Sequence, residues 1–133
     1  MSDEKATAFL QQTMSLCKTL GITADEFTKE RVVLALEWAD HLLTSADLMH
    51  GGAIMALADS AGGACAFLNL PDGSKGTATI ESKTNFLGGA RGGMVIATAP
   101  PLHIGSTTIV VETEVTNGDR LVAKVTQTQI VLK

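Results

Sequence analysis

Residues 50–68 read HGGAIMALADSAGGACAFL, and this stretch decides the fold. The segment has the length of a helix, is small or apolar on every side, and carries one carboxylate, Asp59, in its middle. A helix that is apolar all round is normally buried all round, in a protein core or in a membrane. The sequence therefore predicts a central helix over about 51–68, buried on all sides and opened by His50, Gly51 and Gly52.

Length, charge and cysteine content narrow the class of protein. A chain of 133 residues fits one domain, here 1–133, and such a domain buries roughly two-thirds of the surface that its unfolded chain exposes. The formal net charge of −4 argues against a dedicated nucleic-acid binder, because such proteins normally carry a basic face. Cys17 and Cys65 are far apart in apolar surroundings, and the three histidines lack zinc-ligand spacing. We therefore expect reduced core cysteines and no metal site.

Neither a signal peptide nor a membrane span is expected. The N-terminus, MSDEK, is charged and is not followed by the apolar core of a signal peptide. The central segment contains Asp59 and is rich in glycine and alanine, which partition weakly into a bilayer. We therefore expect a cytoplasmic protein without membrane insertion.

The rest of the chain predicts one helix before the central segment and mainly strands after it. Between residues 5 and 20 apolar residues recur at helical spacing, and Gly21 is placed to end that helix. A strand is predicted over 28–38 and a loop over 39–49. After the turn-rich connector 69–75 the apolar period changes to two, which predicts strands over 77–87, 94–103, 107–116 and 121–132. Pro100-Pro101 predicts a bend, bulge or edge, and Asn117-Gly118 predicts a type I′ hairpin turn.

This order of elements, with His50-Gly51-Gly52 opening the helix and Asp59 nine residues after the histidine, resembles the hotdog-fold acyl-CoA thioesterases of the phenylacetate-pathway (PaaI-like) family. The likeness extends from about residue 34 to the end. It implies an α+β hotdog fold, in which a curved antiparallel sheet wraps around one long central helix. The N-terminal helix predicted from the apolar spacing of residues 5–20 completes the expected fold. The likeness also implies a homodimer that pairs into a dimer of dimers, an acyl-CoA thioester as substrate, and no cofactor.

The resemblance also implies roles for individual residues. Asp59 matches the catalytic carboxylate, Gly51 the glycine whose backbone N–H polarises the thioester carbonyl, and His50 the histidine that shapes that turn. Thr79 falls where related enzymes place a hydroxyl that positions the carboxylate or a water. The positions predicted to bind the substrate and its coenzyme A portion are Thr44, Gly52, Glu81, Phe86, Arg91, His103, Gly105, Ser106 and Thr107.

Two of these positions need separate comment. Thr44 lies six residues before His50, where many relatives carry an asparagine that helps to hold the carbonyl or the water. A threonine hydroxyl is shorter and lacks the two amide donors, so either another group does that work or the activity is weaker. Arg91, like Arg120 and Lys124, is a candidate cation for the nucleotide phosphates, or an ordinary solvated side chain. The glycines that flank Arg91 fit hairpin geometry better than a phosphate cradle, because no helix follows them.

The spacing between Gly51 and Asp59 predicts a site shared between two chains. Thioester hydrolysis needs a base or nucleophile beside the carbonyl carbon and donors aimed at its oxygen, and the start of a helix supplies unpaired N–H groups. Eight residues separate the two positions, which is about 12 Å along a helix. One carbonyl cannot touch both groups on one helix, whereas two antiparallel helices would bring Gly51 of one protomer near Asp59 of the other. The site therefore predicts an isologous homodimer.

Several alternatives remain open from the residues alone. Asp59 is either catalytic or structural, in which case it faces a polar rim or caps a neighbouring loop, since a buried isolated carboxylate is costly unless it is paired or useful. As a catalytic group it either attacks the thioester or activates a water. His50 fits a structural hydrogen-bonding role better than that of a general base. The predicted function is acyl-CoA hydrolysis; the alternative is a non-catalytic acyl-CoA-binding or regulatory hotdog protein. A third candidate is a hotdog dehydratase that acts on hydroxyacyl thioesters. The sequence does not show the histidine and acidic residue of such enzymes at the matching positions.

Overall fold

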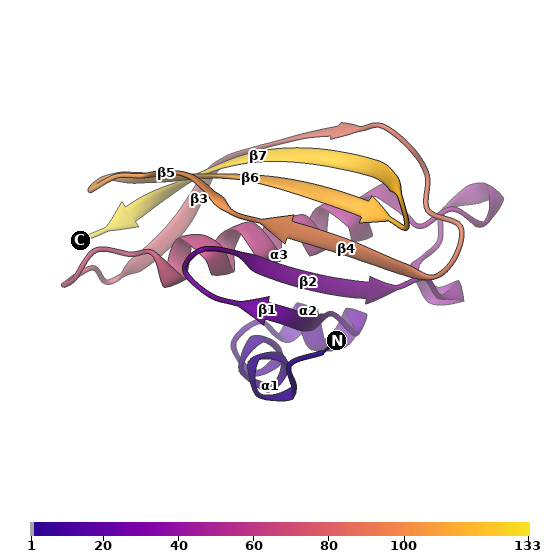
Figure 1. Ribbon diagram of the computed structural model, residues 1–133, viewed down its shortest axis with the longest axis horizontal. Helices are drawn as coiled ribbons and strands as arrows, with labels where there is room; N and C mark the ends of the chain where they lie inside the picture. The colour runs from indigo at the N-terminus through magenta and orange to yellow at the C-terminus, as the bar shows by residue number, and fades with distance from the viewer. Residues whose placement is uncertain (1) are drawn as a thin grey trace.

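A long helix, α3 (Gly51–Leu68), packs against a curved antiparallel sheet in the computed structural model, which describes residues 2–133 (Figure 1). Helices α1 (Glu4–Thr13) and α2 (Ser15–Leu20) lie at the N-terminus, and the short 3₁₀ turns η1 (Asp40–Leu42) and η2 (Ser45–Asp47) precede α3. The strands are β1 (Thr23–Phe27), β2 (Val32–Glu37), β3 (Gly76–Phe86), β4 (Met94–Ala99), β5 (Pro101–Ile104), β6 (Thr108–Asn117) and β7 (Arg120–Leu132).

The sheet runs in the order β1-β2-β4-β6-β7-β3, with β5 paired to β6, and every pair is antiparallel. Irregularities in register interrupt the β1/β2, β3/β7, β5/β6 and β6/β7 pairs. Such bulges increase the twist of a sheet, and the sheet curves over α3 (Figure 1). The predicted α+β arrangement, one sheet wrapped around one helix, is confirmed.

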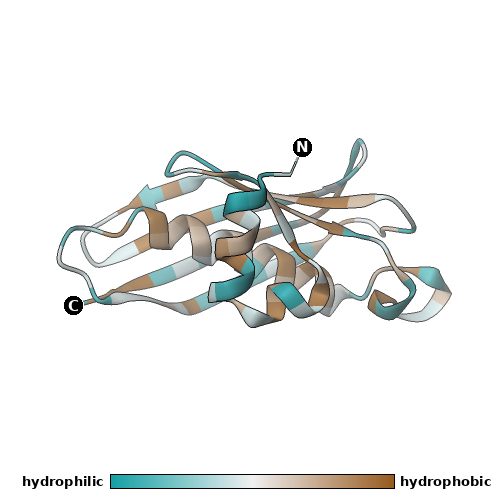
Figure 2. Cartoon of the chain, turned by 90° about the horizontal axis from the view of Figure 1, so that it is seen from below, coloured by the Kyte–Doolittle hydropathy of each residue, from teal (hydrophilic) through white to brown (hydrophobic). Residues whose placement is uncertain are grey.

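The core lies between α3 and the concave face of the sheet. The strands alternate apolar and polar residues (Figure 2), so that one face of each is buried. Small residues on α3, including Ala58, Ala61 and Gly62, are buried against the concave face of the sheet. Their small size allows the helix to approach the sheet closely. The apolar inward-facing residues of the central strands include Leu34, Leu36, Val95, Ala97, Ile109, Val111, Val115, Ala123 and Val125.

Complete burial of α3 was a wrong prediction. The sheet leaves one stripe of the helix exposed, which consists of Gly52, Met55, Asp59 and Phe67. By length and composition alone α3 is long and apolar enough to cross a membrane, as many core helices of globular proteins are. Half of it is buried inside this fold. One sheet curves around only part of a helix, so the uncovered stripe of α3 remains available for a ligand or a second chain.

The N-terminal region differs from prediction in two ways. The single helix expected over 5–20 is two helices, because Met14 is extended and its N–H donates to the Leu10 carbonyl. The break lets α1 pack against β1 while α2 packs against α3. The strand expected over 28–38 is the shorter β2, and β1 was missed. Side chains on α1 pair with the backbone of this region: Thr7 Oγ1 accepts from Ala24 N (2.9 Å), and Gln11 Nε2 donates to Ile22 O (2.9 Å).

The C-terminal strands follow the prediction except at two turns. The strand predicted over 94–103 divides at Pro100 into β4 and β5, so the expected bend is confirmed. The hairpin between β6 and β7 is also confirmed, but its two central residues are Gly118 and Asp119. Only Gly118 has positive φ (62°), whereas a type I′ turn needs positive φ at both. Asn117 instead donates its side-chain amide to Gly92 O and Met94 O (2.8 and 2.9 Å), which ties the hairpin to the preceding loop.

The two cysteines are expected to react slowly in the folded protein. Both are free and buried, and burial raises the pKa of both thiols, that of Cys65 to about 11. Because the thiolate is the reactive form, Ellman's reagent at a mildly alkaline pH should label neither thiol until the chain opens, and both at once in concentrated urea. A Ser15→Cys variant, exposed on α2, is the matched control and should be labelled rapidly. Rapid native labelling of Cys17 or Cys65 would contradict their placement.

Candidate active site

Asp59 lies in the middle of α3, on the stripe that the sheet leaves uncovered. Its side chain reaches solvent, but the exposed or half-buried residues one helical turn away, Met55, Ala56 and Gly63, are apolar. Burial raises the pKa of the Asp59 carboxyl above its ordinary value. Its Oδ1 accepts a hydrogen bond of 3.1 Å from the side-chain amide of Gln127. The other carboxylate oxygen has no hydrogen-bond partner among the described residues, so it is free to accept a proton.

A polar network connects Asp59 to the edge strand β3. Besides Asp59 Oδ1, Gln127 Nε2 approaches Thr79 Oγ1 at 3.4 Å. Gln129 Nε2 also donates to Thr79 Oγ1, and Gln129 Oε1 accepts from Thr77 Oγ1 at 3.0 Å. Both glutamines are buried on the inward face of β7. Thr79 therefore accepts hydrogen bonds from two amides, and its own hydroxyl proton stays unused within the described chain.

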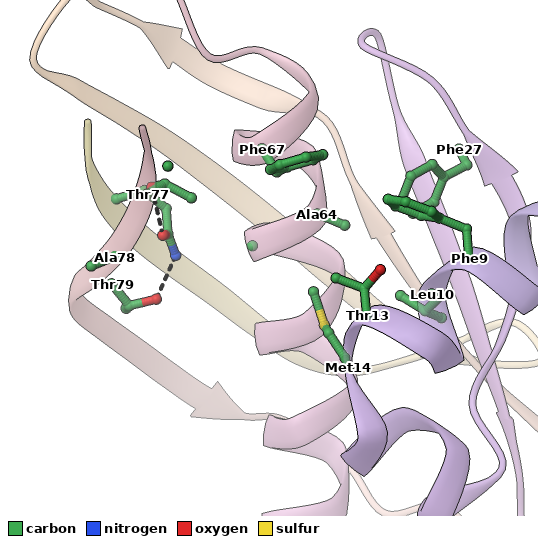
Figure 3. A pocket seen from close by; sticks show the side chains of 13 residues that line it. Phe9, Leu10, Thr13, Met14, Phe27, Ala64, Phe67, Thr77, Ala78 and Thr79 are labelled. Atoms are coloured by element: carbon green, nitrogen blue, oxygen red, sulfur yellow. Dashed lines mark hydrogen bonds between the residues drawn. The ribbon is translucent and has the colours of Figure 1, made fainter. Parts of the chain in front are cut away.

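A cavity of about 370 Å³ opens beside this network (Figure 3). One wall is the strip of β3 and β7 residues that includes Thr77, Thr79 and Gln129, and the opposite walls come from α1, α3 and β1. Figure 3 shows Phe67 on one side and the Phe9–Phe27 pair on the other; those two rings meet edge to face with centroids 5.9 Å apart. The apolar lining is Phe9, Leu10, Met14, Phe27, Ala64, Phe67 and Ala78. The cavity can accept an apolar group that has one polar edge.

The start of α3 forms a second part of the candidate site. His50 caps the helix, because its Nδ1 accepts a hydrogen bond of 2.7 Å from Gly52 N. The Gly51 N–H has no acceptor among the described residues, as expected for the first N–H of a helix. Phe86 lies over Gly51, where an added Cβ would come within 3.2 Å of its ring. His50 thus makes a structural hydrogen bond of the kind that was favoured, and its part in catalysis stays a prediction. The free N–H of Gly51 can donate to a ligand oxygen.

Other predicted residues cluster at this same end of α3. Thr44 is exposed, and its backbone N–H donates to Leu48 O (2.8 Å) in the loop before the helix. That loop is paired with the β3–β4 connection, since Met49 N donates to Ala90 O (2.9 Å). Arg91 in that connection is exposed and has no hydrogen-bond or ion-pair partner among residues 2–133. The helix start, Thr44 and Arg91 are therefore grouped.

The two other candidate cations have partners. Arg120 donates to Gly89 O (2.8 Å), and Lys124 lies 3.3 and 3.6 Å from the carboxylates of Glu112 and Glu114. Arg120 thus donates from one nitrogen to the backbone, and Lys124 is paired with two carboxylates. Of the three candidate cations, Arg91 is the one without a side-chain partner among residues 2–133.

The predicted coenzyme A turn lies at the opposite end of α3. His103, Ser106 and Thr107 are exposed in and after β5. Gly105 allows a tight turn, because an added Cβ would come within 2.8 Å of His103 Nε2. A hollow beside Ser106 is also lined by residues 71–74 from the connector that follows α3. One chain therefore does not bring this turn to the Gly51 end.

Glu81 lies apart from Asp59. The register break between Thr79 and Glu81 pairs Glu81 with Thr128, which is on the outer face of the sheet, whereas Thr79 pairs with the inward-facing Gln129. Glu81 therefore lies on the outer face while Thr79 joins the network. The role of Glu81 as a ligand contact stays a prediction. Among the described residues, no three His, Cys, Asp or Glu side chains gather as they would around a metal ion.

The sequence-based prediction missed Gln127, Gln129 and Gly62. An added Cβ at Gly62 would collide with Gln127 Oε1, so the glutamine lies directly against the helix backbone. The signal was present in the strand pattern: the inward positions of β7 are otherwise small or apolar, and two amides interrupt them. Polar groups on a buried face are normally retained only with partners. The two amides therefore indicate that this strand has a polar function, but only the register of the sheet places Gln127 next to Asp59.

A family comparison fits this geometry. The model of the thioesterase superfamily matches residues 47–124, which is more than half of the chain and includes all of α3. The chain belongs to the thioesterase superfamily. The family's reaction is the hydrolysis of thioesters, and the hotdog fold predicted from the sequence is confirmed.

Individual relatives agree with the family assignment. The chain is 35% identical over 96 residues to ComA2 of Bacillus subtilis, a candidate esterase, and the match covers 72% of this chain and 76% of that protein. It is 31% identical over 105 residues to the 1,4-dihydroxy-2-naphthoyl-CoA hydrolase of Listeria monocytogenes, and the match covers 78% of this chain and 84% of that protein. The crystal structure of a mutant of thioesterase PA1618 from Pseudomonas aeruginosa superposes with a TM-score of 0.86 at 25% identity, covering 95% of this chain and 93% of that one.

The cap at His50 gives a stability prediction. His50→Ala removes the acceptor for Gly52 N–H, which should lower the free energy of unfolding by about 1 kcal/mol. His50→Ser restores an acceptor at the same place and should recover most of that loss. Urea unfolding followed by circular dichroism measures both. If His50 is only a helix cap, the His50→Ser variant should also keep thioesterase turnover within a few-fold of the parent. If His50→Ser is fully stable but both variants lose turnover, His50 acts instead as a general base.

Proposed function

We propose that this thioesterase hydrolyses acyl-CoA to a free acid and coenzyme A, with Asp59 as the base or nucleophile. The observation that carries the proposal is the carboxylate of Asp59, exposed on an otherwise apolar helix face and held by one amide donor. Such a carboxylate is a functional-site candidate because its surroundings raise its pKa. The hydrolase named for a naphthoyl-CoA among the relatives supports a coenzyme A thioester as the substrate.

Hydrolysis needs an attacking oxygen and a place for negative charge. As a base, ionised Asp59 takes a proton from a water whose oxygen attacks the thioester carbon; as a nucleophile, its own oxygen attacks and water later cleaves the anhydride. In both routes the carbonyl oxygen becomes negative, and the free N–H of Gly51 is suited to stabilise it. Collapse of the tetrahedral intermediate breaks the C–S bond and releases the coenzyme A thiolate, which takes up a proton.

The two groups of one chain are too far apart for one carbonyl, so the active enzyme is proposed to be a homodimer. Gly51 and Asp59 are separated by about 12 Å along α3. The outer edge of β3 has no strand paired to it within the described chain, and Ile80, Phe86 and Leu87 are 59%, 49% and 59% exposed beside it. Long open edges with apolar side chains favour pairing with another strand. Antiparallel β3 pairing across a twofold axis would bring each Gly51 toward the partner's Asp59.

Further association into a dimer of dimers has separate support. Large apolar side chains are also exposed on other strands, and such surfaces commonly mark interaction sites. They are Met94 on β4, Leu102 and Ile104 on β5, and Ile130 on β7.

The acyl group is proposed to be apolar and of aryl or medium-chain size. The cavity beside Thr79 holds about 370 Å³ and is lined mainly by apolar residues, and pockets of this type bind ligands through apolar contact plus a few polar groups. Arg91 and the turn 103–107 are the proposed contacts for the coenzyme A portion. Because these lie at opposite ends of one chain, each coenzyme A is proposed to contact both protomers.

Thr44 favours an alternative function. At this position many PaaI-like relatives carry an asparagine, and the exposed Thr44 hydroxyl cannot replace both amide donors. A protein that binds acyl-CoA without hydrolysing it is therefore the second candidate. Steady-state assays with a panel of acyl-CoAs and a thiol reagent separate the two, because binding without turnover across the whole panel would exclude the enzyme.

Asp59→Asn tests the assignment of the carboxylate. The variant should lose hydrolysis by about 100-fold or more, because an amide neither takes a proton nor attacks a carbonyl. Its fold and its oligomeric state should match those of the parent by circular dichroism and sedimentation. Glu30→Gln, which removes an exposed carboxylate at the β1–β2 turn, is the matched control and should leave turnover unchanged. Near-normal turnover of Asp59→Asn would refute the assignment.

Mixed dimers test whether the site is shared. Gly51→Pro removes the N–H at the first position of a helix, where proline is tolerated, and should lower turnover strongly, whereas Gly51→Ala keeps the N–H and controls for the contact with Phe86. When Gly51→Pro and Asp59→Asn chains are mixed and allowed to exchange, half of the dimers are hybrids with one intact site. Activity should then recover to about a quarter of the parent value. No recovery despite proven exchange would mean that both groups come from one chain.

A further inference from the structure

Two glutamines occupy places on β7 where apolar residues would be buried without a desolvation penalty. Gln127 and Gln129 are 0% and 2% exposed, and the inward neighbours before and after them are Val125 and Val131. The Oε1 atom of Gln127 is fully buried without a hydrogen-bond partner. A buried amide with an unpaired oxygen lowers stability, so space filling alone does not account for glutamine at this position.

The nitrogen of Gln127 is the atom with partners. Gln127 Nε2 lies 3.1 Å from Asp59 Oδ1, 3.4 Å from Asp59 O and 3.4 Å from Thr79 Oγ1. The opposite amide orientation would turn Oε1 toward the carboxylate and the carbonyl, where two acceptors would repel each other. The amide group is therefore oriented by Asp59 itself, with its nitrogen toward the carboxylate.

Gly62 makes that contact possible. It lies three residues after Asp59 on the covered side of α3 and is buried. Its missing side chain leaves room for Gln127 Oε1, which an added Cβ would strike. The glutamine is thus confined between the helix backbone and the sheet, and it has little freedom to move away from Asp59.

We propose that Gln127 is a positioning residue for thioester hydrolysis: seated against Gly62, it holds the Asp59 carboxylate in its ionised form and in one orientation. The inference rests on the proposed role of Asp59 in hydrolysis. Gln129 supports the arrangement from the other side by fixing the Thr79 hydroxyl. A hydrogen bond donated to a carboxylate favours its charged form, so we expect the Gln127 donor to oppose the effect of burial on Asp59.

Few polar or titratable side chains face Asp59, so few groups influence the pKa of its carboxyl. The inward faces of β2, β4 and β6 carry apolar residues and Thr113, and β3 and β7 present Thr79 and Gln127. From α2, Cys17 is the titratable group that senses the Asp59 charge, and its thiol pKa is raised mainly by burial. No described cation contributes to the shift of Asp59. Loss of the Gln127 donor should therefore be visible in the titration of Asp59.

The test compares Gln127→Met, which keeps the length of the side chain without its amide, with Thr128→Val on the outer face of the same strand. In the full-length protein, the ¹³Cγ signal of Asp59, assigned by its absence in Asp59→Asn, reports the pKa directly. We expect Gln127→Met to raise that pKa, to move the acidic limb of kcat/KM to higher pH, and to lower kcat by about 10- to 100-fold. KM should change little, and Thr128→Val should match the parent in every measurement.

Each outcome decides between the roles. An unchanged Asp59 pKa with unchanged kcat in a folded Gln127→Met protein would overturn the proposal. An altered pKa in a protein that hydrolyses no acyl-CoA would support the positioning and refute the proposed function. Should Gln127→Met fail to fold, Gly62→Ala keeps every polar group and only displaces the glutamine; it should give the same upward shift, and an unshifted pKa in this variant would overturn the proposal.

Discussion

The close approach of α3 to the inner face of the sheet is the constraint on which the other features depend, because a single sheet can wrap a helix only if the covered side of that helix is narrow. Ala58, Ala61 and Gly62 supply that narrow side. Larger residues there would force the layers apart, and overpacking of a core costs about 1–3 kcal/mol. The same requirement leaves the opposite stripe of α3 without a covering layer. Asp59 is on that stripe, so the packing of the core also exposes the candidate catalytic group.

The candidate site lowers the stability of the fold. Burial raises the pKa of Asp59, so the native chain holds that proton more tightly than the unfolded chain does. The Asp59 contribution therefore favours the fold most below the ordinary aspartate pKa, and it is lost as the pH rises through the higher native value. Gln127 keeps an unpaired oxygen in the core, at a typical cost of about 1–3 kcal/mol. Costs of this kind are common at functional sites, where local stability is given up for chemistry.

The arrangement of the site follows from the direction of α3. The helix start, with the free N–H of Gly51 and the loop that holds Arg91, lies at one end, and the turn with Ser106 lies at the other. Asp59 is between them, joined to the edge strand by Gln127 and Thr79. The groups proposed to act on a thioester are thus distributed along 18 residues of helix. The open edge of β3 offers a route by which a second chain can supply the missing half.

Much of this protein was determined by the sequence alone. The composition of residues 50–68 predicted the helix, the period of two predicted the later strands, and the spacing of Gly51 and Asp59 predicted that one helix cannot complete the site. These features depend on residues close together in the chain, whose propensities and periods are local. The order of elements predicted one antiparallel sheet against one helix, because few architectures accommodate one apolar helix followed by antiparallel strands. The hotdog fold itself was implied by the family resemblance that motif and order carry together.

Only the tertiary structure decided the remainder. Strand β1 was missed because its region is hydrogen-bonded by Thr7 and Gln11 of α1, and nothing within TADEF announces those partners. The exposed stripe of α3 depends on how far the sheet curves. Gln127 meets Asp59 across 68 residues of chain, and the bulge after Thr79 directs Thr79 inward and Glu81 outward. Register and curvature arise from contacts between distant segments, so the residues that hold the carboxylate could be located only in the folded chain.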